Sequence, residues 1–581
     1  MLMQDSYLGR QIPEIAFWRP HIKGSAGAVT APDSYAAQAG MEILQAGGNA
    51  ADAAVAAFLA IGVAEPFHAG IGGGCFQLFY HRQSRQFLAV DARGVAPLGS
   101  YPEMFLDERG EVDPELTDYS GRSAAIPAAY RGLDLLLKKY GTMTWKQVSQ
   151  PAIRMCRQGF VCGFMYEQCA RNAEARHNAQ AFEGFRELYW PQGKPPRYGQ
   201  VLYNPQLADT MEAVAENGVD WFYEGPVGRE LVQAANRYGG IFSQEDLTRC
   251  RAKERVPVKG SYRGYQVVSM PPPSSGGAHL IQMLNILENF DLKKLGYHSA
   301  DSVHLLTEVM KIMYADRSVA MGDPDFVRIQ LERIIDKEYA RQLAEQVDMS
   351  RAREYRPNPE LEALPAEAPS NTANFCVMDR YGNALVSTQT IRNWWGSGVV
   401  VPGRGFVLNC AMADFSPKPG VKTSHGMAYG QANSVRPGAT PLSSMSPTLL
   451  MKGDEPYLAL GAVGGPRIIT STLQMILNVV DYDMMMDLAV REPYLCCLNQ
   501  QAGLELEFGF SPDTMRELER RGHWLRALPA AGVLATIPNG IQKLEGDFFP
   551  GETGRTDGAA GVLTENGSVA YNGTIYQLPA G

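Results

Sequence analysis

The sequence lacks the features of membrane-spanning and nucleic-acid-binding proteins. Its longest apolar run, residues 53–64, is about half of the roughly 20 residues that a transmembrane helix needs, and Asp52 and Glu65 flank it. It has 53 Lys+Arg against 62 Asp+Glu, a net charge of -9 and no basic stretch, so a phosphate backbone finds no cluster of cations. The composition argues against both a membrane and a nucleic acid as partners.

Signals for disulfides, metals and export are also missing. The nine cysteines are an odd number in 581 residues and none forms a CxxC pair, so we expect reduced thiols. His298 and His304 lie six residues apart and the other histidines are scattered, so we expect no metal. Residues 1–20 carry an acid before any base and no unbroken apolar stretch, which predicts a cytoplasmic protein.

The first half of the sequence reads mainly as helices. An Ala-rich stretch over 50–64 predicts a buried helix. The glycine run 70–74 then leads into a predicted strand over 75–80. This order is the reverse of a dinucleotide-binding fingerprint, so we interpret the glycines as a tight turn. Further helical segments are predicted over 125–160, 160–260 and 278–344, with an irregular, proline-rich interruption at 270–277.

A change of pattern occurs near residue 370. Residues 350–370 alternate prolines with glutamates and keep no hydrophobic period, which indicates an exposed connector. A period of two follows at once and predicts strands over 374–378 and 384–390, joined by a hairpin turn. Later segments are predicted as a second hairpin with strands 399–401 and 406–408, a strand over 457–460 and a helix near 468–480. Helices grouped early and strands grouped late indicate an α+β layered architecture.

Thr372 stands where the connector meets the first of these strands. A threonine hydroxyl is a weak nucleophile until a base removes its proton. Cutting the chain between Asn371 and Thr372 would create an α-amine, with a usual pKa of about 7.7 to 8.0, on the same residue. An Asn-Thr pair alone carries no information, because threonine is common in strands.

Longer blocks of sequence supply the missing context. They are GGNAADAAVAAFLAIGVAEP (47–66), GIGGGCF (70–76), DARGVAP (91–97), MPPPSSGG (270–277), GDPDF (322–326), NTANFCVMDRYGNA (371–384), GSGVVVPGRGFVLN (396–409), DFSPKPG (414–420), PLSSMSPT (441–448) and GAVGGPRIIT (461–470). In these blocks, and in their order over roughly residues 25 to 575, the sequence resembles the gamma-glutamyltranspeptidase family of N-terminal-nucleophile hydrolases. The resemblance implies a four-layer αββα sandwich.

The resemblance further implies a zymogen that cleaves itself between Asn371 and Thr372. The products would be a large chain, 1–371, and a small catalytic chain, 372–581, which stay together as one composite domain and act on a small-molecule amide without a cofactor. Thr372 matches the nucleophile and Thr390 the residue that orients it. Gly464 and Gly465 match the glycines of the oxyanion hole, where the lack of side chains lets backbone N–H groups approach a developing alkoxide.

Substrate-binding positions follow from the same resemblance. Arg93, Ser443 and Ser444 match residues that bind the α-carboxylate of a glutamyl substrate, and a guanidinium with two hydroxyls suits a planar carboxylate. Asp414 matches the carboxylate that pairs with the substrate ammonium. His425 falls in the segment that resembles the family's lid, where we expect it to close the pocket.

Three positions around the substrate ammonium depart from the family pattern. The sequence has Gly94 in place of Glu, Arg392 in place of Asn and Ala411 in place of Gln. These changes remove acceptors and add a cation, which disfavours an ammonium unless Arg392 turns away or is neutralised by Asp414.

Three functions therefore stay open. The first is hydrolysis or transfer of a γ-glutamyl-type acyl group carried on Thr372. The second is an amidase for a dicarboxylic monoamide without the ammonium, such as a glutaryl amide, with Arg392 holding the negative charge. The third is a non-catalytic binding homologue that stays one chain.

Overall fold

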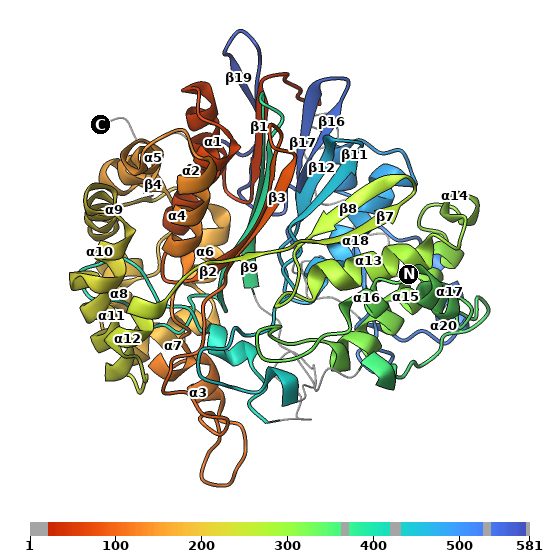
Figure 1. Ribbon diagram of the computed structural model, residues 1–581, viewed down its shortest axis with the longest axis horizontal. Helices are drawn as coiled ribbons and strands as arrows, with labels where there is room; N and C mark the ends of the chain where they lie inside the picture. The colour runs from red at the N-terminus through yellow and green to blue at the C-terminus, as the bar shows by residue number, and fades with distance from the viewer. Residues whose placement is uncertain (1–20, 362–370, 419–430, 527–535, 577–581) are drawn as a thin grey trace, which may run out of the picture.

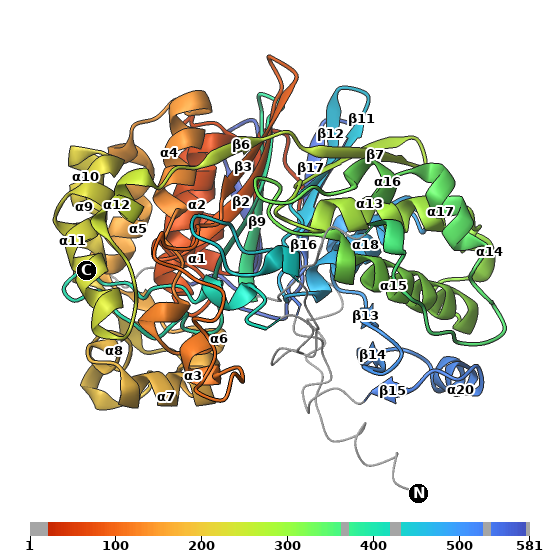
Figure 2. The same ribbon diagram turned by 60° about the horizontal axis from the view of Figure 1, so that its bottom comes forward.

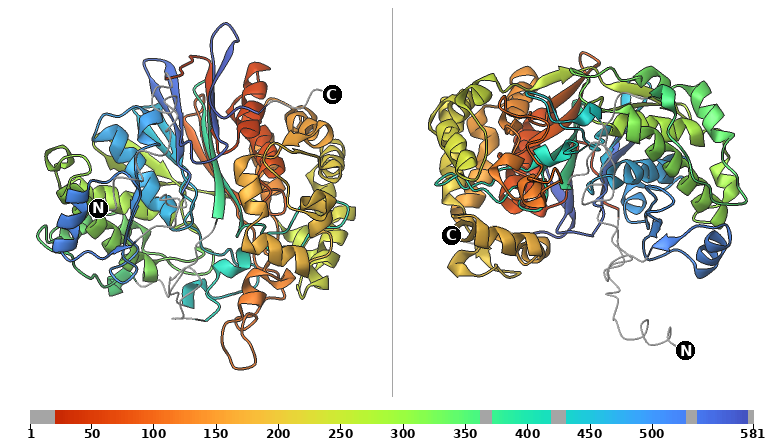
Figure 3. Two further views of the ribbon diagram at one scale, coloured as in Figure 1. Left: turned by 180° about the vertical axis from the view of Figure 1, so that it is seen from behind. Right: turned by 90° about the horizontal axis from the view of Figure 1, so that it is seen from below.

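The protein folds into four layers, with two β-sheets face to face and helices on the outer side of each (Figure 1). The computed structural model describes residues 21–361, 371–418, 431–526 and 536–576. Seen from below in Figure 3, the two helical layers lie on opposite sides of the paired sheets. The expected αββα sandwich is confirmed.

The larger sheet combines early and late parts of the chain. Its eight strands, in spatial order, are β19 (Val569–Gly573), β18 (Ala559–Leu563), β1 (Gly27–Ala31), β9 (Asn371–Asp379), β10 (Ala384–Arg392), β2 (Gly74–His81), β3 (Gln86–Ala92) and β6 (Lys253–Arg255). Neighbouring strands are antiparallel. Because β1, β2 and β3 come from the first hundred residues, the strands are less concentrated late in the chain than expected.

The second sheet faces the first. Its strands are β17 (Asp547–Glu552), β16 (Asn539–Leu544), β12 (Glu455–Gly461), β11 (Thr448–Lys452), β8 (Tyr265–Ser269) and β7 (Val258–Tyr262). Smaller sheets are formed by β13 (Leu495–Cys496), β14 (Leu504–Leu506) and β15 (Leu525–Arg526), and by β4 (Phe160–Val161) and β5 (Val201–Leu202).

Helix α2 (Ala50–Ala64) packs on β9 and β10, and every residue in it is buried. Its start is fixed by a capping box, because the Asn49 side chain accepts the Asp52 N–H at 3.2 Å while the Asp52 carboxylate accepts the Asn49 N–H at 2.9 Å. The same Asp52 accepts from the Thr142 hydroxyl at 2.7 Å. The Ala-rich pattern therefore gives the predicted helix, and its small side chains allow close packing on the sheet.

Other helices complete this first outer layer. They include α1 (Ser34–Gln45), α4 (Ala129–Tyr140), α5 (Trp145–Gln158), α9 (Pro205–Asn217), α10 (Val219–Glu224), α11 (Pro226–Arg237) and α12 (Gln244–Arg249). Beside them lie α3 (Pro114–Asp118), α6 (Phe164–Ala170), α7 (Ala173–Ala181) and α8 (Phe185–Tyr189), at the lower end of Figure 2.

The second outer layer covers the smaller of the two facing sheets. It contains α13 (Gly276–Leu287), α14 (Leu292–Leu295), α15 (Ala300–Ala320), α16 (Leu331–Ile334), α17 (Lys337–Ala344), α18 (Arg467–Val480) and α19 (Met486–Ala489). The strands β13, β14 and β15 lie beside α20 (Pro512–Arg520) at the edge of this layer (Figure 2). Among the described residues, no helix is long and apolar enough to cross a bilayer.

Three of the sequence-based predictions of helices and strands need correction. Helix α13 begins at Gly276, two residues inside the stretch that we expected to be irregular. Strand β9 begins at Asn371, earlier than the start predicted at residue 374. The hairpin predicted over 399–408 is wrong as a pair of strands: Val400 and Val407 form only an isolated bridge.

Candidate active site

Thr372 is fully buried near the start of β9, and its side chain faces the space between the two sheets. Ala373, Phe375 and Val377 pack in the core under the first helical layer, whereas Cys376 and Met378 pack in the core between the sheets. Because side chains alternate along a strand, Thr372 lies on the same side as Cys376 and Met378. The strand thus presents the hydroxyl to the interior of the sandwich.

Thr390 lies opposite Thr372 in a β-bulge. The register pairs Gln389 with Ala373 and then shifts, so that Arg392 pairs with Asn371. Thr390 and Ile391 therefore share the place opposite Thr372. The Thr390 Oγ1 accepts the Arg392 backbone N–H at 2.8 Å. The structure thus brings the two threonines together at the irregular point of the sheet.

Arg392 has a left-handed backbone, with φ of 78°, at the end of this bulge. A bulky residue with positive φ is uncommon, and such strain is often found at functional sites. The bulge and this conformation turn the Arg392 side chain away from the strand ladder and toward residues 411–414.

Gly464 and Gly465 lie in the turn between β12 and α18, with φ of 126° and 61°. The turn is held by Val463, whose carbonyl accepts the Thr536 hydroxyl at 2.7 Å. Both glycines are buried, and neither N–H donates a hydrogen bond to any residue that the structure describes. Buried backbone donors without an acceptor are rare and indicate a place for a ligand oxygen.

The end of β12 connects this turn to the nucleophile's strand. A Cβ at Gly461 would lie 2.4 Å from the Asn374 Oδ1, so β12 touches β9 directly on the face that carries Thr372 and Asn374. The unpartnered glycine amides follow three and four residues after that contact. The nucleophile therefore lies on β9, and the candidate oxyanion donors lie in the turn that follows the adjoining strand β12 of the facing sheet.

Arg93 follows β3 and is buried at the other side of the site. Its Nη2 makes an ion pair with the Asp414 Oδ2, and its Nε donates to the Pro441 carbonyl at 3.3 Å. Its Nη1 is buried and has no hydrogen-bond partner in the described part of the chain. Burial lowers the pKa of Arg93, although Asp414 opposes this effect. The orphaned Nη1 has the chemistry of a carboxylate-binding donor.

Asp414 is shared between two arginines. Besides Arg93, it accepts from the Arg392 Nε at 2.9 Å through its Oδ1. Burial raises the pKa of Asp414, and the two guanidinium groups act in the opposite direction. The carboxylate expected to hold a substrate ammonium is thus already occupied by two cations.

Asp118, half-buried at the end of α3, completes a network of four charged groups whose other three members are buried. It pairs with the Arg392 Nη1 and accepts from the Asn393 Nδ2 at 2.9 Å. Burial alone would lower the pKa of Arg392, but the carboxylates of Asp118 and Asp414 raise it. Arg392 therefore stays charged, and its positive charge is balanced by the carboxylates of Asp118 and Asp414. Asp118 was not foreseen, because no local pattern links it to a strand 274 residues away.

The two other departures from the family pattern bring no polar side chain. Gly94 has φ of 97°, and a Cβ there would lie 2.5 Å from the Ile126 carbonyl oxygen, so this backbone admits no side chain. Ala411 is buried in a small apolar cluster with Met412 and Phe415. Neither position supplies an acceptor to a substrate ammonium.

Ser443 and Ser444 lie in the segment whose Pro441 carbonyl contacts Arg93. The Ser443 Oγ accepts the Met445 N–H at 3.1 Å. The Ser444 Oγ accepts from Nη2 of the buried Arg317 at 2.6 Å, so its own proton is left for another acceptor. Arg317, on α15, was also unforeseen. His425 and the side chain of Asn371 lie outside the described residues.

The comparisons with known proteins agree with this arrangement. The family model described as Gamma-glutamyltranspeptidase matches residues 36–561. The chain is 40% identical over 521 residues to a protein of Escherichia coli (strain K12) named glutathione hydrolase proenzyme, covering 89% of this chain and 88% of that one. It is 35% identical over 506 residues to a protein of Pseudomonas sp. (strain SE83) named Acylase ACY 1 proenzyme, covering 86% and 87%. The crystal structure of cephalosporin acylase from Bacillus halodurans is similar with a TM-score of 0.85 and 26% identity, covering 97% of this chain and 99% of that one.

Proposed function

The chain belongs to the gamma-glutamyltranspeptidase family, and from this we infer that it is a self-processing amide hydrolase or acyltransferase acting on γ-glutamyl-type amides. The names of its relatives describe hydrolases and acylases made as proenzymes, which favours an enzyme over a non-catalytic binding homologue. The cytoplasmic location stays a prediction.

We propose that the chain cuts itself between Asn371 and Thr372 into chains 1–371 and 372–581. The eight-stranded sheet alternates contributions from the two parts, since β9 lies beside β1 and β10 lies beside β2. Separating the products would break both ladders. This interleaving supports a stable pair of chains that remains one composite domain.

In the proposed reaction, the α-amine of Thr372 takes the proton of its own Oγ1, which attacks the carbonyl carbon of the substrate amide. The N–H groups of Gly464 and Gly465 bind the resulting oxyanion, a contribution typically of about 3–4 kcal/mol per donor. The amine product leaves with the proton, and an ester on Thr372 remains. Water or an acceptor amine then attacks the ester and regenerates the hydroxyl.

The single observation that carries this proposal is that Thr372 lies on a strand adjoining β12, and that the turn after β12 holds two buried amides with no acceptor among the described residues. Arg93 adds a third orphaned donor, suited to a carboxylate at the far end of the acyl chain. In the proposed roles, Thr390 orients Thr372, Arg93 with Ser443 and Ser444 binds the carboxylate, and Asp414 meets the ammonium.

A second candidate is an amidase for dicarboxylic monoamides without the ammonium. The observation that favours it is that Asp414 is held by both Arg93 and Arg392, while Gly94 and Ala411 bring no acceptor. An ammonium would have to compete with two guanidinium groups for one carboxylate, whereas a glutaryl chain needs only the carboxylate donor.

Anilides of γ-glutamate and glutarate distinguish the two candidates, because these acyl groups differ only in the amino group. Purified, processed enzyme should release aniline from both, and the ratio of kcat/KM values measures the free energy of ammonium recognition. A higher value for the γ-glutamyl anilide supports the first candidate. A higher value for the glutaryl anilide overturns it in favour of the second.

A further inference from the structure

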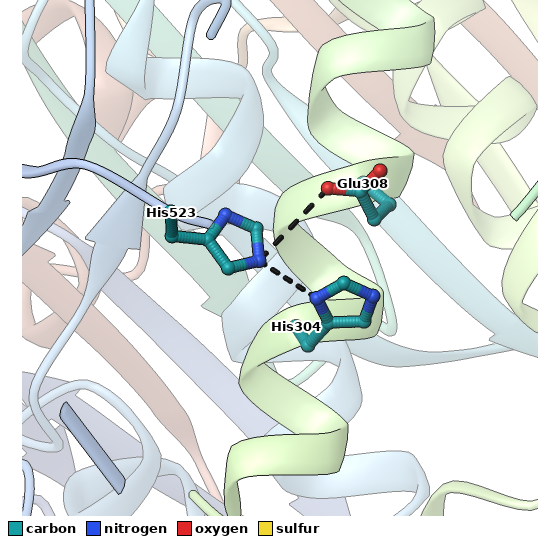
Figure 4. Close-up of side chains that lie close together, drawn as sticks. All are labelled: His304, Glu308 and His523. Carbon is teal, nitrogen blue, oxygen red and sulfur yellow. Dashed lines mark hydrogen bonds and ion pairs between the residues drawn. The ribbon is translucent and has the colours of Figure 1, made fainter. Parts of the chain in front are cut away.

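A cluster of metal-binding side chains lies outside the proposed active site, between α15 and the turn that follows α20. His304 and Glu308 are one turn apart on α15, and His523 approaches them from that turn (Figure 4). All three are buried, and one donor atom from each lies within 4.8 Å of the other two. In the part of the chain that the structure describes, this is the one group of three such residues this close together.

The rings are oriented as ligands. The His304 Nδ1 lies 2.7 Å from the His523 Nε2, so at least one of these nitrogens has a lone pair directed into the cluster. The His304 Nε2 lies 2.9 Å from the Asp348 carbonyl oxygen, to which it donates. A backbone carbonyl on the outer nitrogen is the arrangement that fixes the tautomer and orientation of metal-binding histidines.

The carboxylate is oriented in the same way. The Glu308 Oε2 accepts the Arg353 N–H at 3.1 Å and the Tyr355 hydroxyl at 2.8 Å. These two contacts hold the group so that Oε1 faces the His523 Nε2 at 4.0 Å. The three donors thus come from two elements, and neighbours outside the cluster fix His304 and Glu308.

We propose that His304, Glu308 and His523 bind one zinc ion, which joins the segments on either side of residue 372. Two imidazoles and one carboxylate are a donor set that suits zinc rather than magnesium or calcium. With bonds of about 2.0–2.1 Å, tetrahedral ligands lie about 3.3 Å apart. The His–His separation of 2.7 Å and the His–Glu separation of 4.0 Å lie on either side of that value, so small shifts of opposite sense accommodate the ion.

Positive charges near the site lower its affinity for a metal cation. The Lys311 Nζ lies 2.5 Å from the Glu308 Oε1, and its positive charge opposes binding of a dication. Burial and the positive charge of Arg521 lower the pKa of both histidine rings. Arg521 is itself paired with Asp301 and Glu517.

Lys311 has two other acceptors, the Arg353 carbonyl at 2.5 Å and the Gln500 Oε1 at 2.8 Å, which keep it bonded when zinc takes the Glu308 Oε1. Lys311→Gln should therefore bind zinc more tightly than the wild type.

The position of the site gives the ion a structural role. His304 and Glu308 lie before the proposed cleavage site and His523 lies after it. Resting on the proposed processing, a bound zinc would link the two chains through side chains alone. Zinc binding itself needs no processing, so the uncut Thr372→Ala chain should bind the same amount.

The test is the metal content of untagged protein expressed with added zinc and dialysed extensively, together with a Co²⁺ titration read by visible absorption. We expect about one zinc per chain and the d–d band of a four-coordinate site. His304→Gln and His523→Gln should weaken binding by more than the 10- to 100-fold typical of outer-shell changes. His177→Gln, which changes a partly exposed histidine outside the cluster, should keep the metal.

Wild-type protein without zinc and without the Co²⁺ band would overturn the proposal, leaving a hydrogen-bonded histidine pair. Equal zinc in His523→Gln and in the wild type would overturn it as well. If His523→Gln does not fold, Lys311→Gln decides: tighter binding supports the site, and unchanged binding contradicts it. In processed protein, a chelator should also promote separation of the chains in mild denaturant.

Discussion

The Arg392 Nε lies 2.9 Å from the Asp414 Oδ1, and this pairing puts a cation beside the carboxylate that should receive a substrate ammonium. Asp118 pairs with the Nη1 of the same guanidinium and helps to fix its position. We therefore expect substrate preference to depend on how Asp414 is shared. The predictions below separate that question from the catalytic machinery.

Arg392→Asn should raise the ratio of γ-glutamyl to glutaryl turnover. The substitution frees the Asp414 Oδ1 as an acceptor, and a hydrogen bond to a charged group contributes about 1.5–3 kcal/mol, or roughly 10- to 150-fold. Asp118→Asn is the matched control, because it keeps Arg392 against Asp414 and should not raise the ratio. Steady-state kinetics on both anilides measure the ratio of γ-glutamyl to glutaryl turnover. An unchanged ratio in Arg392→Asn would show that Asp414 does not govern the preference between the two acyl groups.

Arg93→Met should raise KM for both anilides by about 10- to 150-fold, because each substrate carries the carboxylate that the orphaned Nη1 is proposed to bind. The effect on kcat should be smaller, since the interaction exists before the transition state. Arg404→Met, which removes a partly exposed partner of Glu230, is the control and should leave KM unchanged. A normal KM in Arg93→Met would remove Arg93 from the carboxylate site.

Gly465→Ala should lower kcat, by up to the roughly 100- to 1,000-fold typical of losing an oxyanion donor, because a side chain at this backbone conformation displaces the N–H proposed to bind the oxyanion. Its φ of 61° also strains an alanine by about 1–2 kcal/mol. Gly453→Ala controls for that strain, because Gly453 has φ of 60° in the β11–β12 hairpin with open space at its Cβ. Thermal unfolding should shift similarly in both variants. Equal losses of kcat would mean that strain alone explains the effect.

Thr390→Val should slow both self-cleavage and turnover. It removes the hydroxyl that accepts the Arg392 N–H, and a lost buried hydrogen bond costs about 1–3 kcal/mol, or roughly 5- to 150-fold in rate. Thr472→Val is a suitable control, because that buried hydroxyl has no hydrogen-bond partner among the described residues. Processing is followed on denaturing gels and turnover with the anilides. Full rates in Thr390→Val would refute an orienting role.

The elements with strong local signals could be predicted from the sequence. The Ala-rich run with Asn49 and Asp52 gives α2 as expected, and the period of two gives β9 and β10. The segment 399–408 was misread, because Gly403 and Gly405 adopt positive φ and leave only one bridge between its arms. The two runs of consecutive apolar residues there pack into the core without forming a ladder.

The chemistry of the pocket could be predicted only in part. Family blocks point to Thr372, Arg93 and Asp414, but not to Asp118, whose contact with Arg392 spans 274 residues and leaves no period in the sequence. The cluster on α15 was missed for a related reason. Histidine spacing alone does not reveal it, because its helical pair is His304 with Glu308 and its third member comes from a distant turn.

Sequencing the N-terminus of the smaller chain tests the central claim most directly. Denaturing gels of active protein should show chains of about 41 and 23 kDa, the residue shares of 63.6 kDa, and the smaller should begin Thr-Ala-Asn-Phe. Thr372→Ala should stay one chain without activity. Full activity in a preparation that is uncut at Thr372 would contradict the account.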